Sequence, residues 1–384
     1  MPYWRLSSFY FFYFASLGVL VPYWPIYLNH QQFNALEIAQ LAALVLATKI
    51  IAPNIWGFVG DHTGKRLLLV RSAALLSLVF FSLVFFVESF WGLALVMGLF
   101  SFFWNAALPQ FEVITLNFLG RAAAQNYTLV RLWGSVGFIV AVSSLGVLLE
   151  WISPVWIPVA VVLLFLGISV SSFCVPPVSV ITPVQMEDSF LRILLQPRVM
   201  VFFLACILLQ MSHGPYYVFY SLYMAQQDYP KSLIGALWSL GVMAEIIMFI
   251  FLGGIVRRFG LSVVFITSIA MAVLRWLLIA YFAPFWTMQV LAQLLHAATF
   301  GSYHAVAIQI IHGYFPGKFQ GRGQALYSSM SFGLGGAMGS LFSGYLWVQQ
   351  GPQILFLAAA GIAALALALS ISLVFLSSLQ VEKP

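Results

Sequence analysis

The chain has 384 residues, of which 62% are hydrophobic and only 7% are charged. Because soluble proteins carry about 25% charged residues, this composition excludes a soluble globular fold and indicates a protein that crosses the bilayer repeatedly. The formal net charge of +6 does not indicate nucleic-acid binding, because Lys and Arg are spread over short segments between hydrophobic runs.

The hydrophobic runs predict an all-α membrane protein with twelve transmembrane helices. One span needs about 20 predominantly apolar residues. The segments that meet this requirement are residues 6–28, 36–59, 67–87, 90–118, 126–149, 154–174, 198–224, 232–256, 261–282, 284–311, 321–348 and 352–376. We expect the first span to remain in the mature protein, because its apolar run is long and has no small-residue cleavage site.

The residues that usually mark a disulfide framework, a metal site or an intramembrane enzyme do not form such patterns. Cys174 and Cys206 both fall inside expected spans, at no metal-ligand spacing. The sequence has no His-Glu-x-x-His segment and no convincing Gly-x-Ser-x-Gly segment. We therefore expect packing cysteines, no metal, no cofactor and no enzymatic activity.

A charged segment between the second and third expected spans returns in altered form later in the chain. The segment is residues 57–66, GFVGDHTGKR, and adding 196 carries Gly57 to Gly253 and Gly64 to Gly260. The same shift carries Tyr27 to Tyr223, Ile38 to Ile234 and Gly137 to Gly333. One offset without gaps over so much of the chain indicates a duplication.

The duplication predicts two pseudo-symmetric six-helix halves joined by a linker. The longest connection, residues 175–197, is rich in proline and lies between the sixth and seventh expected spans. We therefore expect an N-terminal half over 1–174, a cytoplasmic linker over 175–197 and a C-terminal half over 198–384 that ends in a short cytoplasmic tail.

The short connections between spans predict which side of the membrane each faces. Short cytoplasmic connections retain Lys and Arg, and with the N-terminus inside only Lys231 falls on the outer side. The cations then on the cytoplasmic side or at its edge are Arg5, Lys65, Arg66, Arg71, Arg121, Arg192, Arg198, Arg257, Arg258, Lys318, Arg322 and Lys383. Both termini are therefore expected in the cytoplasm.

Five charged residues remain inside expected spans, namely Lys49, Glu112, Arg131, Glu245 and Arg275. Each costs about 2.5–3.5 kcal/mol on scales of helix insertion into the membrane. Such residues usually line a polar cavity, and the alternative for any one of them is an internal salt bridge that only holds helices together. Three cations against two carboxylates leave one positive charge over, which suits a monocarboxylate substrate.

Polar and aromatic residues surround the two carboxylates in the helical pattern. Asn105 lies two turns before Glu112, and Trp238 lies two turns before Glu245. Aromatic residues expected to line a cavity are Tyr23, Trp24, Tyr27, Tyr216, Tyr220 and Trp238. Aromatic residues are abundant throughout the chain, so packing or lipid contact is the alternative for each. His213 and His304 are open to the same alternative.

The connector resembles the signature of the major facilitator superfamily. That family has a Gly-x-x-x-Asp-Arg-x-Gly-Arg/Lys pattern between its second and third spans, and the matching residues here are Gly57, Asp61, Gly64, Lys65 and Arg66. His62 stands where a basic residue is usual. The resemblance covers the whole chain and implies two six-helix halves that expose a central site to each side of the membrane in turn. Asp61 is expected to act on that conformational equilibrium.

Four further segments, VRLWGSVGF at 130–138, LWSLGVMAE at 237–245, VLRW at 273–276 and QLLHAATF at 293–300, resemble the 3-phenylpropionate permease group of that superfamily. This group is similar to the lactose permease type of proton symporter. In that type a fourth-span Glu and a fifth-span Arg bind substrate, which points to Glu112 and Arg131. The eighth-span Glu, ninth-span Arg and tenth-span His of its proton and substrate machinery match Glu245, Arg275 and His296.

One departure from that pattern concerns the proton carrier. The carboxylate expected three residues after His296 is Thr299, which makes Glu245 the first candidate to carry the proton and Glu112 the second. The expected substrate-binding residues are Glu112, Arg131, Arg275, His296, Asn105 and Lys49.

The resemblance implies a bacterial inner-membrane transporter that takes up a small aromatic carboxylate with protons. We expect a monomer, because nothing in the sequence demands more. A proton symporter for an uncharged substrate, such as a sugar or a nucleoside, is the nearest alternative. A gated channel or receptor is disfavoured, because the halves carry unlike charges at equivalent positions, Lys49 and Glu245.

Overall fold

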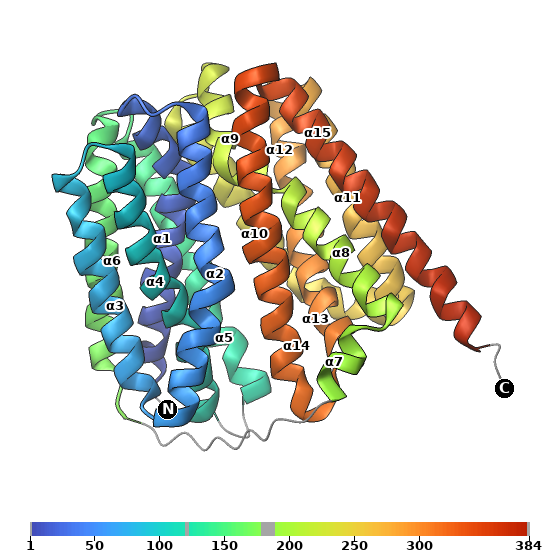
Figure 1. Ribbon diagram of the computed structural model, residues 1–384. Helices are drawn as coiled ribbons and strands as arrows, with labels where there is room; N and C mark the ends of the chain where they lie inside the picture. The colour runs from blue at the N-terminus through green and yellow to red at the C-terminus, as the bar shows by residue number, and fades with distance from the viewer. Residues whose placement is uncertain (1, 120–122, 178–188, 382–384) are drawn as a thin grey trace. The chain divides into compact units, whose positions relative to one another are not determined.

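The computed structural model describes residues 2–119, 123–177 and 189–381. These residues are built from helices and the short turns that join them (Figure 1). Eleven helical segments in the described chain are long and apolar enough to cross a membrane. The last, Gln320–Leu373, contains the non-helical residue Gly351, with φ 79° and ψ 176°, followed by Pro352, so it comprises two helices. The expected all-α fold with twelve spans is therefore confirmed.

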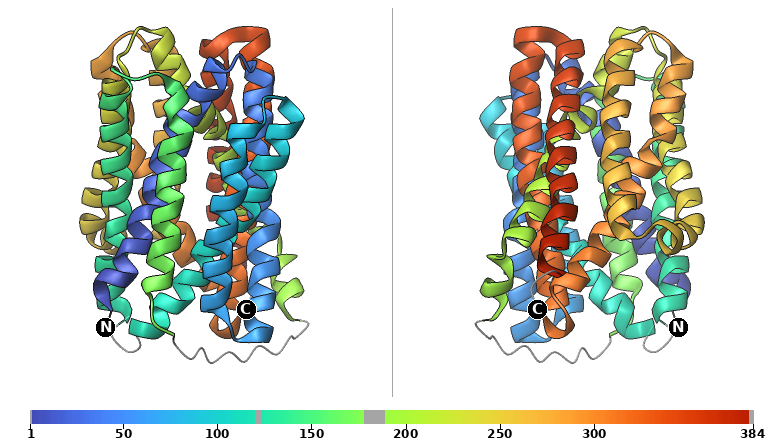
Figure 2. Two further views of the ribbon diagram at one scale, coloured as in Figure 1. Left: turned by 90° about the vertical axis from the view of Figure 1, so that its left-hand side faces the viewer. Right: turned by 90° about the vertical axis from the view of Figure 1, so that its right-hand side faces the viewer.

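The helices form two compact units, and unit 1 contains Met1–Val184 together with Asp228–Ser239. Its helices are α1 (Tyr3–His30), α2 (Ala35–Thr63), α3 (Arg66–Ser82) with the 3₁₀ turn η1 (Leu83–Phe86), α4 (Phe90–Leu119), α5 (Ala123–Leu148) and α6 (Ile157–Cys174) with the 3₁₀ turn η3 (Pro154–Trp156). Within this unit α1 lies alongside α5 and α6 (Figures 1 and 2).

Unit 2 contains Gln185–Gln227 and Leu240–Pro384. Its elements are α7 (Ser189–Leu194), α8 (Pro197–Ser212), α9 (Gly214–Gln226), α10 (Lys231–Phe259), α11 (Leu261–Tyr281), α12 (Trp286–Leu294), η4 (Ala297–Ser302), α13 (Tyr303–Tyr314), η5 (Gly317–Phe319), α14 (Gln320–Tyr327), η6 (Ser328–Gly335) and α15 (Gly336–Val381). The first residues of α10, up to Ser239, belong to unit 1.

The expected seventh span is interrupted between α8 and α9. His213 ends α8, and Gly214 and Pro215 begin α9. Proline has no N–H to donate and its ring crowds the preceding turn, which explains a break at this point. Gly214 also lies against the backbone of Gly339 in α15, where a Cβ atom would find no room. The break therefore places α9 in close contact with α15.

The tenth and eleventh expected spans each contain a π-helical segment. The tenth is formed by α12, η4 and α13, and η4 over Ala297–Ser302 is π-helical. The eleventh begins with α14 and continues through η6, which is π-helical over Ser328–Gly335. Such segments insert an extra residue into a helical turn and are frequent at functional sites. The apolar pattern of the sequence alone did not indicate either segment.

Glycines allow helices of the same unit to approach one another closely. A Cβ atom on Gly18 of α1 would lie 2.7 Å from the carbonyl oxygen of Phe138 in α5, and one on Gly137 of α5 would overlap the backbone of Phe11. Adding 196 to 18 gives Gly214, the close-contact glycine of unit 2. Small residues at helix contacts are the usual means of dense packing in membranes.

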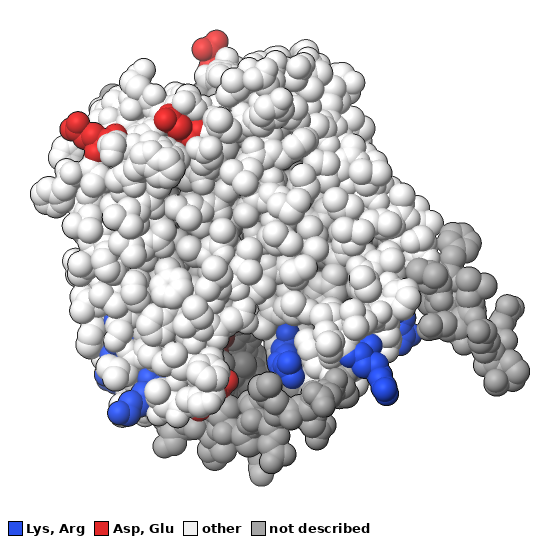
Figure 3. Space-filling model, in the orientation of Figure 1, with Lys and Arg blue, Asp and Glu red and all other residues white. Residues whose placement is uncertain are grey.

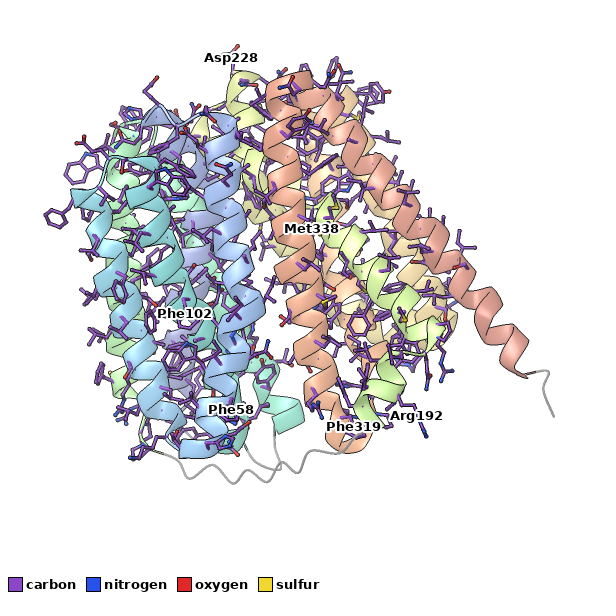
Figure 4. The ribbon with its side chains drawn as sticks, in the orientation of Figure 1. Phe58, Phe102, Arg192, Asp228, Phe319 and Met338 are labelled. Carbon is purple, nitrogen blue, oxygen red and sulfur yellow. The ribbon has the colours of Figure 1, made fainter. Side chains whose placement is uncertain are left out.

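The charged side chains of each unit gather toward the helix ends. In unit 1, the Lys and Arg side chains visible in Figure 3 lie at the end where the N-terminus is found, and most Asp and Glu lie at the other end. Asp228 of this unit is labelled at that other end in Figure 4. In unit 2 the visible basic side chains lie near α7, where Figure 4 labels Arg192.

We expect Gly137→Ala to destabilise unit 1, because the added methyl group would overlap the backbone of Phe11 and force α1 and α5 apart. The midpoint of thermal unfolding of the detergent-solubilised protein should fall by several degrees. Gly361→Ala is the matched control, since Gly361 is exposed and nothing lies near its missing Cβ. Equal midpoints for both variants would contradict close contact at Gly137.

Candidate functional site

The connector between α2 and α3 is held by one ion pair and one amide. Arg66, at the start of α3, forms an ion pair with Asp61 and donates a hydrogen bond to the side-chain oxygen of Gln110 in α4. Gly64 ends α2 in the left-handed conformation, with φ 67°, which glycine adopts without steric cost. The Asp61 carboxylate thus joins the end of α2 to α3, and through Arg66 to α4.

The other connector residues lie around this pair. A Cβ atom on Gly57 would lie 3.8 Å from the side-chain nitrogen of Gln110, in ordinary contact. Lys65 precedes α3 and is exposed. His62, which replaces the usual basic residue, packs on Phe58 with ring centroids 3.9 Å apart, and Figure 4 labels Phe58 near this end of α2. The histidine therefore stays on its own helix.

The equivalent connector of unit 2 keeps the backbone of this motif and loses its carboxylate. Gly260, which corresponds to Gly64, again has positive φ, at 80°. Arg257, which corresponds to Asp61, is exposed. The duplication has thus preserved the turn and changed the charge.

Arg275 of α11 is fully buried in unit 2, with 0% of its surface exposed. Its guanidinium donates to the Ala292 carbonyl oxygen at 2.9 Å, to the Gln293 side-chain oxygen at 3.2 Å and to the Thr299 hydroxyl at 3.3 Å. Its central carbon also lies 4.1 Å from the centroid of the Tyr216 ring. Arg275 therefore links α11 to α12 and η4 by hydrogen bonds.

His296 lies between Arg275 and Glu245. Its Nδ1 is 3.0 Å from a guanidinium nitrogen of Arg275, and its Nε2 is 3.9 Å from Oε2 of Glu245 in α10. Because a guanidinium can only donate, the contact requires Nδ1 as acceptor and leaves Nε2–H directed toward the carboxylate. The three matched positions are thus brought together, with the histidine as the link.

Glu245 is positioned by the π-helical segment that follows His296. A Cβ atom on Gly301 in η4 would lie 2.7 Å from Cγ of Glu245, so glycine leaves the space that this carboxylate side chain occupies. Thr299, which stands where the resemblance led us to expect a carboxylate, is fully buried and bonded to Arg275. Within this group, Glu245 is the carboxylate that faces His296.

Two glutamines complete this cluster and were not predicted as site residues. Gln293 accepts hydrogen bonds from Arg275 and from the Tyr216 hydroxyl at 2.8 Å, and Gln289 accepts from the Tyr220 hydroxyl at 3.4 Å. Positions 289, 293 and 296 follow the i, i+4, i+7 spacing of one helix face. This spacing, which places both glutamines on the same helix face as His296, is the feature of the sequence from which they could have been predicted as site residues.

Unit 1 holds Glu112 and Arg131, each half-buried. They interact electrostatically, but no ion pair joins them in the described chain. The Glu112 carboxylate instead accepts a hydrogen bond from the Tyr127 hydroxyl at 3.1 Å, and the Arg131 guanidinium lies 3.8 Å from the centroid of the Phe14 ring. Glu112 is thus held by a tyrosine hydroxyl, and Arg131 is covered by an aromatic ring.

Lys49 and Asn105 lie on two helices of unit 1 that are hydrogen-bonded together. The Asn105 amide of α4 donates to the Thr48 hydroxyl at 2.8 Å and to the Val45 carbonyl oxygen at 3.0 Å, both in α2. Lys49 follows Thr48 and is half-buried. Among the described residues it has no hydrogen bond or ion pair. Asn105 therefore fixes α2 beside an uncompensated ammonium group.

Most of the expected cavity aromatics are buried in packing contacts. Tyr23 donates to the Val142 carbonyl oxygen at 2.7 Å, and Trp24 stacks on Tyr27 with centroids 4.8 Å apart. Tyr216 covers Arg275, whereas Trp238 is buried in unit 1. Tyr216, with Tyr220 beside it at 5.0 Å between centroids, is where the expected aromatics meet the charged cluster.

The two other histidines lie in aromatic surroundings. His213 is fully buried, its Nδ1 lies 2.8 Å from the Leu209 carbonyl oxygen, and its ring meets the edge of Trp276. His304 contacts the Tyr327 hydroxyl at 3.2 Å. Both thus have packing and hydrogen-bonding roles within unit 2.

These features define an all-helical membrane transporter with buried charges in each half. The model of the family described as "MFS_1 like family" matches residues 3–358, and the chain belongs to this family of the major facilitator superfamily.

Curated relatives and solved structures agree with this assignment. The chain is 30% identical over 370 residues to the "Probable 3-phenylpropionic acid transporter" of Escherichia coli, covering 91% of this chain and 92% of that protein. It is 25% identical over 354 residues to the maltose permease of Geobacillus stearothermophilus, covering 88% and 86%. A crystal structure of a mutant of the nucleoside transporter NupG shares the fold, with a TM-score of 0.87, 18% identity and coverage of 97% and 99%.

We expect Asp61→Asn to slow transport while substrate binding is retained. The amide cannot form the ion pair with Arg66 that joins α2 to α3 and, through Gln110, to α4. Initial uptake rates and equilibrium binding should be measured side by side. Asp228→Asn is the matched control, because Asp228 is on a short connection with φ 60°, a conformation that asparagine also adopts. Loss of binding in Asp61→Asn would contradict a conformational role.

Proposed function

We propose that this protein takes up a small aromatic carboxylate, such as 3-phenylpropionate, together with protons. The observation that carries the substrate class is the 30% identity, over nearly the full length of both chains, to the probable 3-phenylpropionic acid transporter. The charged residues inside the spans support it, because an anion is compensated by their surplus positive charge.

In the proposed mechanism the two halves rock about a central site and expose it to each side of the membrane in turn. The candidate substrate-binding residues are Glu112, Arg131, Arg275, His296, Asn105 and Lys49. Among the arginines, Arg131 is the better candidate for direct contact, because the guanidinium of Arg275 is fully buried and donates to several groups of its own unit. Arg275 then acts by positioning His296 and Gln293.

Proton coupling is assigned to Glu245, with Glu112 as the second candidate. A carboxylate removed from water binds a proton more readily, whereas a neighbouring positive charge favours its ionised form. Glu245 lies 3.9 Å from His296, which contacts Arg275. Movement of this histidine can therefore change how strongly Glu245 holds its proton.

We further propose a monomer in the bacterial inner membrane with both termini in the cytoplasm. The grouping of Lys and Arg at the N-terminal end of unit 1 supports this orientation (Figure 3).

An uncharged substrate is the second candidate function. The buried hydroxyl and amide groups of Tyr216, Tyr220, Gln289 and Gln293 are of the kind that bind sugar or nucleoside hydroxyls. Uptake of maltose or a nucleoside without competition by aromatic acids would favour this function.

The first test is uptake of labelled 3-phenylpropionate into energised membrane vesicles. We expect saturable accumulation that a protonophore abolishes and that unlabelled aromatic acids inhibit. Vesicles without the protein provide the background. Failure of every aromatic acid to be taken up or to compete would overturn the proposed substrate class, and accumulation that survives the protonophore would overturn proton coupling.

The second test concerns the proton carrier. Glu245→Gln should abolish accumulation driven by a pH gradient and retain exchange of labelled for unlabelled substrate, because the amide cannot release a proton. Glu150→Gln is the control, since Glu150 is exposed near a helix end. Normal accumulation with an unchanged dependence on pH in Glu245→Gln would move the assignment to Glu112.

A further inference from the structure

The surplus positive charge of the spans resides in unit 1. In unit 2, Arg275 is balanced by Glu245, and neutral His296 lies between them. Unit 1 holds two cations, Lys49 and Arg131, against the single carboxylate of Glu112. One cation of unit 1 therefore has no counter-charge inside the spans.

The surroundings of the two cations identify which one this is. Arg131 lies in the field of Glu112, and its guanidinium is covered by the Phe14 ring at 3.8 Å. Lys49 forms no ion pair, hydrogen bond or cation–π contact in the described part of the chain. Arg131 therefore has a carboxylate nearby, whereas the ammonium of Lys49 does not. Lys49 is the cation without a counter-charge.

Lys49 occupies the midpoint of α2. It is 14 residues from Ala35 (49 − 35) and 14 from Thr63 (63 − 49). At a rise of about 1.5 Å per residue, its backbone is roughly 21 Å from either end of the helix. A lysine at this depth is far from the helix ends, where lysine side chains usually reach water or headgroups. Its side chain is nevertheless half-buried.

A second unpaired polar atom belongs to Asn105 of α4, whose side chain binds the residue before Lys49. The side-chain nitrogen of Asn105 is bound to Thr48 and Val45, which fixes the orientation of the amide. Its oxygen, Oδ1, is buried and accepts no hydrogen bond within the described residues. Buried polar atoms are normally satisfied, so an ammonium and an unused acceptor on adjacent helices point to a polar ligand.

We propose that Lys49 binds the carboxylate of the transported acid and so determines the preference for acids over neutral analogues. This inference rests on the proposed function. The ammonium has three N–H donors, enough to serve the carboxylate and the Asn105 oxygen together. The equivalent position of unit 2, found by adding 196, is Glu245. The two halves thus divide the work, with unit 1 holding the anion and unit 2 the proton.

The test compares the acid with its amide. Half-saturating concentrations for labelled 3-phenylpropionate, and inhibition by unlabelled acid and by 3-phenylpropionamide, are measured for the intact protein and for Lys49→Gln, Lys49→Arg, Arg131→Gln and Lys231→Gln. We expect Lys49→Gln to raise the half-saturating concentration of the acid by about 10- to 100-fold, because this is the contribution of hydrogen bonds to a charged group. Inhibition by the amide should remain within about twofold, because the amide lacks the charge.

The controls separate charge from structure. Lys49→Arg should keep most of the preference for the acid, since it keeps the positive charge. Lys231→Gln should behave like the unaltered protein, because Lys231 is at the start of α10 outside the spans' interior. Arg131→Gln should lower the affinity for acid and amide by similar factors, as loss of a packed site residue would.

Each result supports or overturns the proposal. If Lys49→Gln lowers the affinity for acid and amide equally, or leaves the affinity for the acid unchanged, the role of Lys49 is overturned. A charge-selective loss in Arg131→Gln with a normal Lys49→Gln would transfer that role to Arg131. If Lys49→Gln binds neither compound, Lys49→Arg decides the question, because loss of the preference for acid in that variant, which keeps the positive charge, would also overturn the proposal. Absence of any acid uptake by the unaltered protein would overturn the proposed function itself, before any variant is compared.

Discussion

The constraint on which this structure depends is the cost of a charge inside a hydrocarbon layer. Backbone polar groups within the spans must be satisfied by the protein, and charged side chains there usually pair with one another or with backbone carbonyls. Arg275 is the clearest case, because its guanidinium is satisfied by a backbone carbonyl, a glutamine, a threonine and a histidine, and is covered by the ring of Tyr216. Such a group holds α11 and the tenth span of unit 2 in one arrangement, with His296 between Arg275 and Glu245.

The duplication shows which features were retained in both halves and which diverged. Glycines remain where backbones touch or turn, as at Gly18 and Gly214, and at Gly64 and Gly260. These positions serve the packing that each half needs independently. Charges differ at equivalent places, with Asp61 opposite Arg257 and Lys49 opposite Glu245. A transporter built from two similar halves can therefore keep one framework and assign different chemistry to each.

The sequence predicted the spans well, because length and hydrophobicity are what a bilayer selects. It also predicted Arg275, His296 and Glu245 as site residues, and these three side chains lie together in unit 2, while their role in transport stays a prediction. It did not indicate the break at His213 or the π-helical segments, since these depend on how neighbouring helices meet. Nor could it show that Tyr127 binds Glu112 while Phe14 covers Arg131, because side-chain partners across helices leave no periodic signal.

The distribution of charge between the units bears on coupling. When empty, unit 2 carries a balanced Arg275 and Glu245, whereas unit 1 carries one surplus cation. Binding of a monocarboxylate would bring the charges of unit 1 to zero, and protonation of Glu245 would add one positive charge to unit 2. A carrier pays a desolvation cost for each uncompensated charge that it moves through the membrane interior. Since the anion removes one such charge and the proton alone creates one, the loaded carrier has the same number of uncompensated charges as the empty carrier, and the proton-only carrier has more. This ordering disfavours movement of a carrier that holds the proton without the acid.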